Sequence, residues 1–459
     1  EIVPCDWSSD VCSSDLGSQL SRISGGWAFS NIAVYSGIPD TASSTMPDSL
    51  VAPGLRAIPI LRLDRNRDGM LDQDDEIWFW GRGPNRWKPH EGAVPGWRYG
   101  IHPYSRKREY LVRLDAPEGS PELAAGSKGS AQALVDDVVQ PIWVGTPDKL
   151  KEVVIGSVPL QTESDLGKDW YWVAVESEGV ATVPLQGLAF PGRVGDSAWV
   201  RPEIANTGWF LDGTERIDSF GVAGRSDRWN LADPGDPVWG GTGLDASTKA
   251  FDFLFSGSRL AIAGLNLAYR RDLSKSDSVL FPAPAVGALE IKVPSGGRCW
   301  VLEEGIAVRT CSIEGGSLRD SARIVDTWYA VFPEATSGSK VSVAPWSPPV
   351  QSHVVKDFTA DRSADVLVVA PEAMLEVAQE YASHREADFQ VRKMKVAIVR
   401  AEDVYQLWSG GQMDPNGMRD AIRWAHRRWG VSHVLLFGAG HVDPRQAMGP
   451  ASEVLIPQW

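Results

Sequence analysis

Val366-Leu367-Val368-Val369 decides the fold, because a β-branched run of this length suits a buried strand and is too short for a helix. Two similar runs follow it, Val396-Ala397-Ile398-Val399 and Val434-Leu435-Leu436-Phe437. The segments between the runs have helical spacing, so the order is strand, helix, strand, helix, strand. This order predicts a parallel, doubly wound sheet, whose ligands and catalytic groups gather beyond the carboxyl ends of the strands.

Both intervening segments carry helix signals. In 371–385 the apolar residues recur every three or four positions and predict one buried face, made of Met374, Val377, Ala378 and Tyr381. In the second segment Asp414 is a predicted N-cap, Pro415 takes the first helical position and Gly430 ends the helix. Its apolar stripe consists of Met418, Ala421, Ile422, Ala425 and Trp429.

The length of 459 residues allows roughly two to four domains, each with a core of its own. The net charge of −14 argues against nucleic acid and anionic membranes as partners. No apolar run reaches the length of a membrane-spanning helix. We therefore expect a folded protein with no nucleic-acid partner and no membrane-spanning segment.

Residues 1–16 are predicted to be an assembly artefact. Residues 5–16 read CDWSSDVCSSDL, which is the translation of a common sequencing-adapter oligonucleotide. This head is therefore left out of the fold prediction. A natural signal peptide would be missing with the true N-terminus, so the lack of one does not indicate a compartment.

The run 64–75 resembles a calcium-binding loop within a strand-rich segment that extends from residue 17 to about 125. Oxygen-bearing side chains stand at loop positions one, three and five, and glycine at position six permits a sharp turn. The predicted calcium ligands are Asp64, Asn66, Asp68, Met70 through its carbonyl, Asp72 through water, and Asp75. Because no helices flank the loop and Asp75 stands where EF-hands have glutamate, we expect a strand-flanked calcium site. An acidic, solvated turn is the alternative.

Residues 138–350 show no convincing helix and are predicted to form a β-sandwich or jelly roll. Strand-like runs recur between turn clusters, at 170–175, 198–201, 251–255, 265–269, 289–293 and 328–332. The small-residue stretch 119–133 is predicted to be a linker or a long surface loop. The loop 225–247, with Trp229 and Trp239, either presents aromatic side chains to a sugar or is pinned to the core by them.

These observations divide the chain into four parts. Residues 1–16 are the artefact, 17–125 a β domain with the calcium-type loop, 138–350 the sandwich, and 363–459 the start of the α/β domain. The fold class is thus multidomain, with β domains followed by a truncated α/β sheet.

Cys299 and Cys311 are the cysteines that remain once the head is set aside. They flank a hairpin-like segment that turns at Glu304-Gly305, and a three-residue loop would place them opposite one another. A cross-strand disulfide would suit an exported protein, and two small buried thiols are the alternative. Two cysteines are too few for a structural zinc site.

Gly438-Ala439-Gly440-His441 follows the third predicted strand, where an active-site loop belongs. His441 could act as a general base or be an ordinary loop histidine. Neither the dinucleotide glycine spacing nor a Gly-Lys-Ser is present, so nucleotide binding is not predicted. The many Asp and Glu residues could include a glycosidase pair, but the sequence does not single one out.

Motifs at both ends of the chain together resemble the gingipain-type cysteine peptidase family and its longer relatives, among them the surface sortase component of the type IX secretion system. At the C-terminal end these are the three strand runs, Ser409-Gly410-Gly411 and 418–423. At the N-terminal end the calcium-type loop runs into Trp78-Phe79-Trp80-Gly81-Arg82-Gly83-Pro84. The resemblance implies a caspase-like α/β domain and an exported or cell-surface enzyme acting on protein or peptide substrates, with secretion-system components as further partners.

Two departures limit what the resemblance implies. The family commonly has Gly-Asp after its third strand, whereas Ala439 follows Gly438 here. The family's Gly-His-Gly motif does not occur, and no cysteine follows Cys311. A Cys–His mechanism needs a thiolate activated by a nearby base. We therefore expect a fragment whose catalytic pair lies beyond its end and which is inactive as it stands. The alternatives are a non-catalytic, calcium-binding surface β protein and a carbohydrate-active protein.

Overall fold

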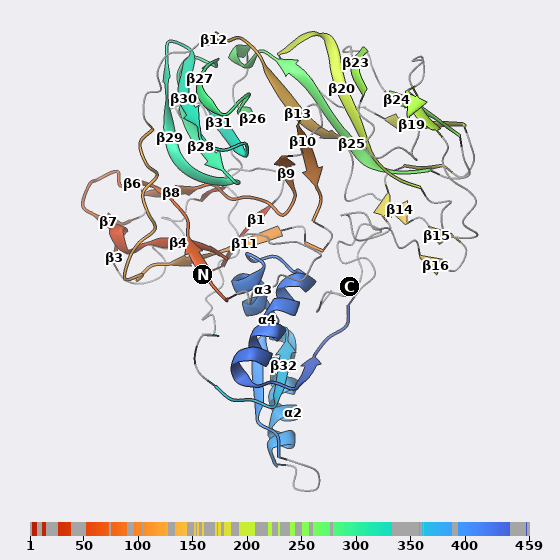
Figure 1. Cartoon of the computed structure of the whole chain (residues 1–459). Coiled ribbons are helices and arrows are strands. Elements are labelled where there is room, and N and C mark those ends of the chain that lie inside the picture. Colours follow the sequence, from red (N-terminus) through yellow and green to blue (C-terminus); the bar gives the residue numbers. More distant parts are fainter. Residues whose placement is uncertain are drawn as a thin grey trace.

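The computed structural model describes the chain in segments. These are 2–6, 12–14, 26–37, 52–72, 75–89, 96–102, 104–105, 107–126, 134–144, 192–206, 260–275, 279–332, 358, 360, 362–387, 393–440 and 456, together with short strands between 151 and 256. The described part consists mostly of β-sheets, and its α-helices lie in the C-terminal unit, drawn in blue in Figure 1. No helix among these segments is long and apolar enough to cross a membrane.

Small antiparallel sheets form the N-terminal part. One has the order β1-β11-β4-β5 (Ile2–Asp6, Lys107–Arg113, Ala33–Gly37, Leu55–Ala57), and another the order β2-β8-β6 (Cys12–Ser14, Glu76–Phe79, Leu61–Leu63). Strand pairs β3-β7 (Trp27–Ala28, Met70–Leu71) and β9-β10 (Arg86–Pro89, Trp97–Gly100) complete it, with the 3-10 turn η1 (Phe29–Asn31). The residues predicted to be an artefact thus supply β1 and β2, and both are edge strands.

The core of this part follows the two-residue period of its strands. Alternate side chains such as Ile77 and Phe79 of β8 and Tyr110 and Val112 of β11 pack into one buried cluster. The stretch 119–133 was predicted to be a linker or a long surface loop. In the structure its described part, 119–126, is instead bonded to strands on both sides. Leu123 N donates to Ile60 O and Thr310 N donates to Ala124 O, so this stretch joins the N-terminal sheets to β29.

The middle of the chain forms further antiparallel sheets. The five-stranded sheet has the order β13-β25-β20-β23 (Val138–Val144, Leu260–Arg271, Arg193–Asn206, Trp239–Gly243), with β18 (Val173–Val175) also paired to β25. A four-stranded sheet has the order β19-β24-β21-β22 (Gly179–Pro184, Ala250–Ser256, Ser219–Val222, Arg228–Trp229). Two strand pairs are β14-β17 (Lys151–Glu152, Trp170–Tyr171) and β15-β16 (Val154–Ile155, Val158–Pro159). Trp229 and Trp239 lie in β22 and β23, and most of the loop 225–247 lies outside the described residues.

A seven-stranded sheet follows, in the order β12-β27-β30-β29-β28-β31-β26. Its strands are Leu134–Val135, Gly287–Lys292, Ser317–Ala322, Ile306–Glu314, Arg298–Glu303, Thr327–Phe332 and Val279–Pro282. The 3-10 turn η2 (Leu273–Lys275) precedes it. Strand β29 pairs with both β28 and β30, and side chains from both halves share one buried core.

The β28–β29 hairpin places Cys299 opposite Cys311, and a disulfide joins them. The predicted three-residue loop is wrong. Glu304 and Gly305 alone form the turn, both with positive φ (52° and 74°), as two-residue hairpin turns require. A register shift between Val301 and Leu302 supplies the offset that brings the cysteines face to face.

The C-terminal unit is a parallel sheet of order β33-β32-β34 (Val396–Arg400, Val366–Ala370, His433–Leu436). Its helical elements are η3 (Glu372–Met374), α2 (Leu375–Ala387), α3 (Ala401–Trp408) and α4 (Pro415–Trp429). Helix α2 packs on one face through Ala378, while α3 and α4 pack on the other face against Leu367 and Val399. The sheet is therefore covered on both faces, as a doubly wound sheet requires.

The ends of α4 follow the predicted signals. Asp414 Oδ1 accepts a hydrogen bond of 2.8 Å from Asn416 N, Pro415 begins the helix, and Gly430 adopts φ 77°. In α2 the predicted inner face is wrong at Val377, which is 51% exposed, whereas Ala378 and Ala382 are buried.

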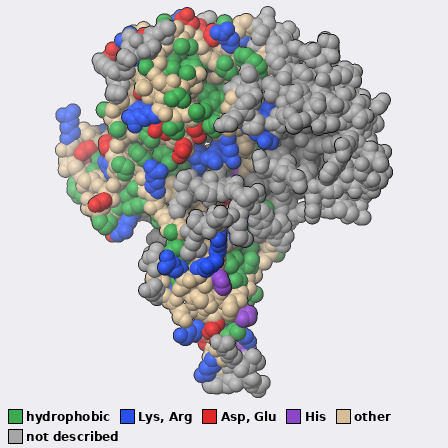
Figure 2. Space-filling model, in the orientation of Figure 1, with side chains coloured by type: hydrophobic (Ala, Val, Ile, Leu, Met, Phe, Trp, Pro, Cys, Tyr) green, Lys and Arg blue, Asp and Glu red, His purple; other side chains and the backbone are tan. Residues whose placement is uncertain are grey.

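The C-terminal unit contacts the N-terminal sheets through the α3–α4 turn. Glu109 N donates to Gly411 O, and Gln406 Nε2 donates to Glu109 Oε2 at 3.1 Å. A side chain at Gly411 would place its Cβ 2.4 Å from Glu109 O, and Gly411 has φ 78°, so only glycine fits this approach. On the face seen in Figure 2, Lys and Arg side chains gather between the β-rich part and the narrower C-terminal unit.

Candidate functional site

The carboxyl edge of the parallel sheet is the first candidate site, because the strand order reverses about β32. At this edge β32 leads into Pro371 and β33 into α3. Beside β32, Phe437 N donates to Val369 O at 2.8 Å, and Gly438 adopts φ 119°. The crevice between the ends of β32 and β34 is thus the place where this fold type positions reacting groups. His441 and Asp443 lie outside the described residues.

Beside β33 the same edge carries a network of charged side chains around Arg400. Its Nη1 donates to Glu372 Oε2 at 2.8 Å, and its Nε donates to Asp403 Oδ1 at 3.2 Å. Glu402 accepts hydrogen bonds from the backbone N of Glu372 at 3.2 and 3.3 Å. Asp403 is 1% exposed, so its carboxylate depends on Arg400 for compensation. The network ties together the loops that leave β32 and β33, although Arg400 Nη2 is buried without a hydrogen-bond partner among the described residues.

The acidic loop 64–75 lies between strands β6 and β8, as expected for a strand-flanked loop, and it contains the short strand β7. Asp64 accepts hydrogen bonds from the backbone N of Arg67 and of Gly69, and Asp75 accepts them from the backbone N of Arg65 and of Asp72. Asp75 is fully buried. The two aspartates therefore fold the loop from its first and last positions.

Asn66 joins the remaining acidic side chains of this loop. Its Nδ2 donates to Asp68 Oδ2 at 3.1 Å and to Asp72 Oδ2 at 2.6 Å, so the amide bridges the two carboxylates. Carboxylate and amide oxygens are the ligand atoms that calcium prefers. Each carboxylate oxygen keeps a lone pair for a metal ion after it has accepted one N–H. Within the described segments, which omit 73 and 74, no three acidic, His or Cys side chains converge closely enough to hold a metal ion.

A cleft of about 540 Å³ lies where the N-terminal strands meet β13 and the seven-stranded sheet. Five aromatic side chains line it, namely Trp80, Trp87, Tyr99, Trp143 and Trp328. The Tyr99 ring lies 5.1 Å from that of Trp87 and 5.2 Å from that of Trp143, so the three rings form a row. Such a volume and aromatic lining are typical of small-ligand sites.

Charged side chains also line this cleft. Asp326 accepts a hydrogen bond from Trp328 Nε1 at 3.1 Å, and burial raises the pKa of its carboxyl above the ordinary value of aspartate. Arg82, Arg86 and Glu304 line the same cleft. The sequence did not identify it, because its walls come from segments more than two hundred residues apart. The Trp-rich run 78–87 was the one available signal.

The pair Cys299 and Cys311 contributes no nucleophile. Cys299 and Cys311 are joined in the disulfide, and Cys299 is 1% exposed within the core of the seven-stranded sheet. Neither can supply the thiolate that a Cys–His mechanism requires.

Comparison with known protein families finds a match for the C-terminal unit. Residues 359–459 match the model of peptidase family C25. The match covers all three parallel strands and their helices, and it confirms for this segment the predicted resemblance to the gingipain-type family.

The whole chain is similar in fold to the crystal structure of dimeric latent PorU from Porphyromonas gingivalis. The TM-score is 0.66 at 16% sequence identity. The alignment covers 99% of this chain and 43% of the PorU chain, so the sequence spans less than half the length of that structure. No curated protein matches the sequence. The sheet-rich architecture predicted for the chain, with few helices and an α/β unit at its end, is confirmed at this level.

Proposed function

We propose that this chain is the leading part of an exported, gingipain-type cysteine peptidase or transpeptidase whose catalytic pair is supplied outside the chain. The observation that carries the proposal is the match of 359–459 to peptidase family C25, over a segment that folds as a doubly wound parallel sheet. In this proposal the sheet is the opening half of a caspase-like domain.

The exposed side of β34 supports the proposal. Among the strands that the structure describes, β34 lies at the edge of its sheet, and Val434 and Leu436 are 41% and 40% exposed. Strands of parallel sheets are usually buried on both faces, because helices cover them. An apolar edge strand of this kind is expected where a larger sheet continues.

The proposed chemistry is acyl transfer from a protein or peptide substrate. A thiolate attacks the peptide carbonyl, the amine leaves with a proton from the paired histidine, and the acyl-enzyme is released to water or to another amine. The residues of this chain would shape the crevice at the ends of β32 and β34. The Arg400 network would hold the neighbouring loops in place. We also propose the cell surface as location and secretion-system components as partners, by similarity in fold to PorU.

Recovering the coding sequence beyond Trp459 tests this function. A Gly-His-Gly motif after a further strand, followed by a cysteine, is the expected result. A continuation that encodes neither would contradict the enzyme and favour a non-catalytic, calcium-binding surface β protein.

We further propose a structural calcium ion in the loop 64–75, held by Asp64, Asn66, Asp68, the Met70 carbonyl, Asp72 through water, and Asp75. The donor types and the strand-flanked position support this proposal. The ion would cross-link the two ends of a loop whose first and last aspartates already bind its backbone.

The aromatic cleft favours a second candidate function, the binding of a saccharide. The row formed by Trp87, Tyr99 and Trp143 offers flat apolar faces, and Asp326 and Glu304 offer acceptors for hydroxyl groups. Affinity electrophoresis in gels containing dextran, mannan or xylan tests it. Retardation by one polysaccharide that is lost in Trp87→Ala and Trp143→Ala is expected, and equal mobility in all gels would exclude it.

A further inference from the structure

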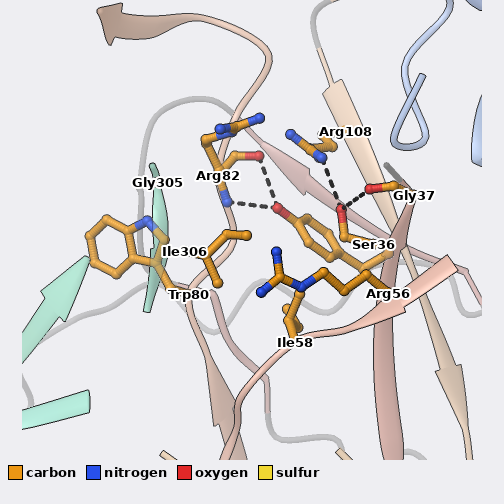
Figure 3. A pocket seen from close by; sticks show the side chains of 10 residues that line it. Ser36, Gly37, Arg56, Ile58, Trp80, Arg82, Arg108, Gly305 and Ile306 are labelled. Carbon is orange, nitrogen blue, oxygen red and sulfur yellow. Dashed lines mark hydrogen bonds between the residues drawn. The ribbon is translucent and has the colours of Figure 1, made fainter. Parts of the chain in front are cut away.

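A second, smaller cavity of about 20 Å³ lies beside the aromatic cleft, and we name it the arginine pocket. Arg56 of β5, Arg82 after β8 and Arg108 of β11 line it together with Ser36, Tyr110 and Gly305 (Figure 3). The three arginines come from segments well separated in the sequence. None of the ten residues that line the pocket is acidic.

Arg108 is 3% exposed, and its donors are only partly used. Its Nη2 donates to Ser36 Oγ at 2.8 Å, whereas its Nε is buried and has no hydrogen-bond partner. A buried donor of a charged group without an acceptor is costly, so the pocket favours an acceptor placed beside Nε.

The other polar groups of the pocket hold the arginines in place. Arg82 Nη1 donates to Glu304 O at 2.9 Å, and Tyr110 OH donates to Arg82 O at 3.1 Å. Ser36 Oγ donates to Gly37 O at 3.3 Å, so its proton is already used. Three arginines thus line one small cavity, and their like charges repel one another in the absence of a negative charge.

We propose that the arginine pocket binds one small anion, either chloride or a carboxylate group, between Arg56, Arg82 and Arg108. A cavity of about 10–15 Å³ holds one water-sized species, so this pocket admits a halide ion or the oxygen end of a carboxylate, but not a whole phosphate. Guanidinium groups suit such ligands, because they present several N–H donors and keep their charge.

The anion would link three parts of the molecule. Arg56 and Arg108 belong to the N-terminal sheet, and Gly305 belongs to the β28–β29 turn. On its other side, Arg108 Nη2 lies so close to the α3–α4 turn that a Cβ on Gly410 would be 2.5 Å away. An occupied pocket thus stabilises the contact of the N-terminal sheet with both neighbours. This inference is independent of the proposed peptidase function.

Thermal unfolding of the full chain at constant ionic strength tests the proposal. Chloride or acetate replaces the HEPES anion in increasing amounts, so that the ionic strength and the general screening of charges stay constant. The HEPES anion is too large to enter the pocket. We expect the Tm to rise and level off with chloride or with acetate, as for a ligand that binds the native state. The two salts distinguish the halide from the carboxylate.

Variants locate the effect. Arg108→Gln should abolish the rise in Tm and Arg56→Gln should weaken it. Arg113→Gln, on the same strand but exposed, should retain it as a control for charge. If Arg108→Gln does not fold, the Tm of Arg56→Gln in the two salts decides whether the pocket binds the anion. Arg56 is exposed and not needed for the core, so this variant should fold. Equal Tm values in all salts, or a rise that persists in Arg56→Gln and Arg108→Gln, would overturn the proposal.

Discussion

Replacement of Asp414 tests how the C-terminal unit is held to the N-terminal sheets. Asp414 is 7% exposed and caps α4 through the 2.8 Å hydrogen bond from Asn416 N. Its other oxygen, Oδ2, lies 3.5 Å from His102 Nε2. Because His102 Nδ1 accepts hydrogen bonds from the backbone N of Tyr104 and of Ser105, Nε2 carries the proton that faces Asp414.

The magnitude follows from these contacts. Loss of an N-cap costs about 1 kcal/mol, loss of a negative charge at a helix N-terminus about 0.5 kcal/mol, and loss of the contact with His102 about 1 kcal/mol. Asp414→Ala loses all three, so we expect the free energy of unfolding to fall by about 2–3 kcal/mol. Asp414→Asn keeps a capping oxygen and should lose about 1–1.5 kcal/mol.

The assay is urea unfolding followed by tryptophan fluorescence, with Asp115→Ala as an exposed control that should leave the midpoint almost unchanged. A double-mutant cycle with His102→Gln should give a coupling of at least about 0.5 kcal/mol. Equal losses for Asp414→Ala and Asp414→Asn would refute the capping role. A cycle without coupling to His102 would refute the contact between the two units.

Three further predictions concern the β part. Asp320→Ala should lower the free energy of unfolding, measured in urea, by about 3–5 kcal/mol. Arg309 Nη2 lies 2.7 Å from the buried Asp320 Oδ2, so the variant leaves the buried guanidinium with less negative charge to compensate it. A loss under about 1 kcal/mol would contradict this prediction. Asp326→Asn should stabilise the protein more at pH 7 than at pH 3. The raised pKa of Asp326 makes its carboxylate form unfavourable in the native state, so the stability of the unmodified protein falls as the pH rises from the ordinary aspartate pKa through the raised pKa. A stability difference between the two proteins that does not depend on pH would be the contrary result. EDTA should lower the Tm, because calcium at a hundredfold excess over its Kd would stabilise the native state by about 2.7 kcal/mol. Asp64→Ala and Asp68→Ala should remove this shift. An unchanged melt in EDTA would exclude the calcium site.

Local signals predicted the three strands of the C-terminal unit and the helices α2 and α4. The β-branched runs form β32–β34, and Asp414, Pro415 and Gly430 bound α4 because capping depends on only a few neighbouring residues. Helix α3 was missed, since it follows β33 without a turn residue and is only eight residues long, which leaves room for a single repeat of its apolar spacing. The hairpin loop was predicted one residue too long, because a bulge has no distinct sequence signal.

The sites that depend on tertiary contacts could not be predicted in this way. Arg56, Arg82 and Arg108 meet only because β5, β11 and the segment after β8 are brought together, and the row of Trp87, Tyr99 and Trp143 needs β13 beside β10. The acidic loop differs, since its residues are contiguous and its strand-flanked position followed from the sequence. Its calcium ligands remain a proposal.

Thiol-dependent cleavage of a fluorescent casein tests the central claim most directly. The chain 1–459 and a version extended along its reading frame are assayed side by side, each with and without iodoacetamide. We expect no hydrolysis by the chain 1–459, and hydrolysis by the extended protein that iodoacetamide abolishes. Turnover by the chain 1–459 that iodoacetamide blocks would contradict the claim that the nucleophile lies outside it.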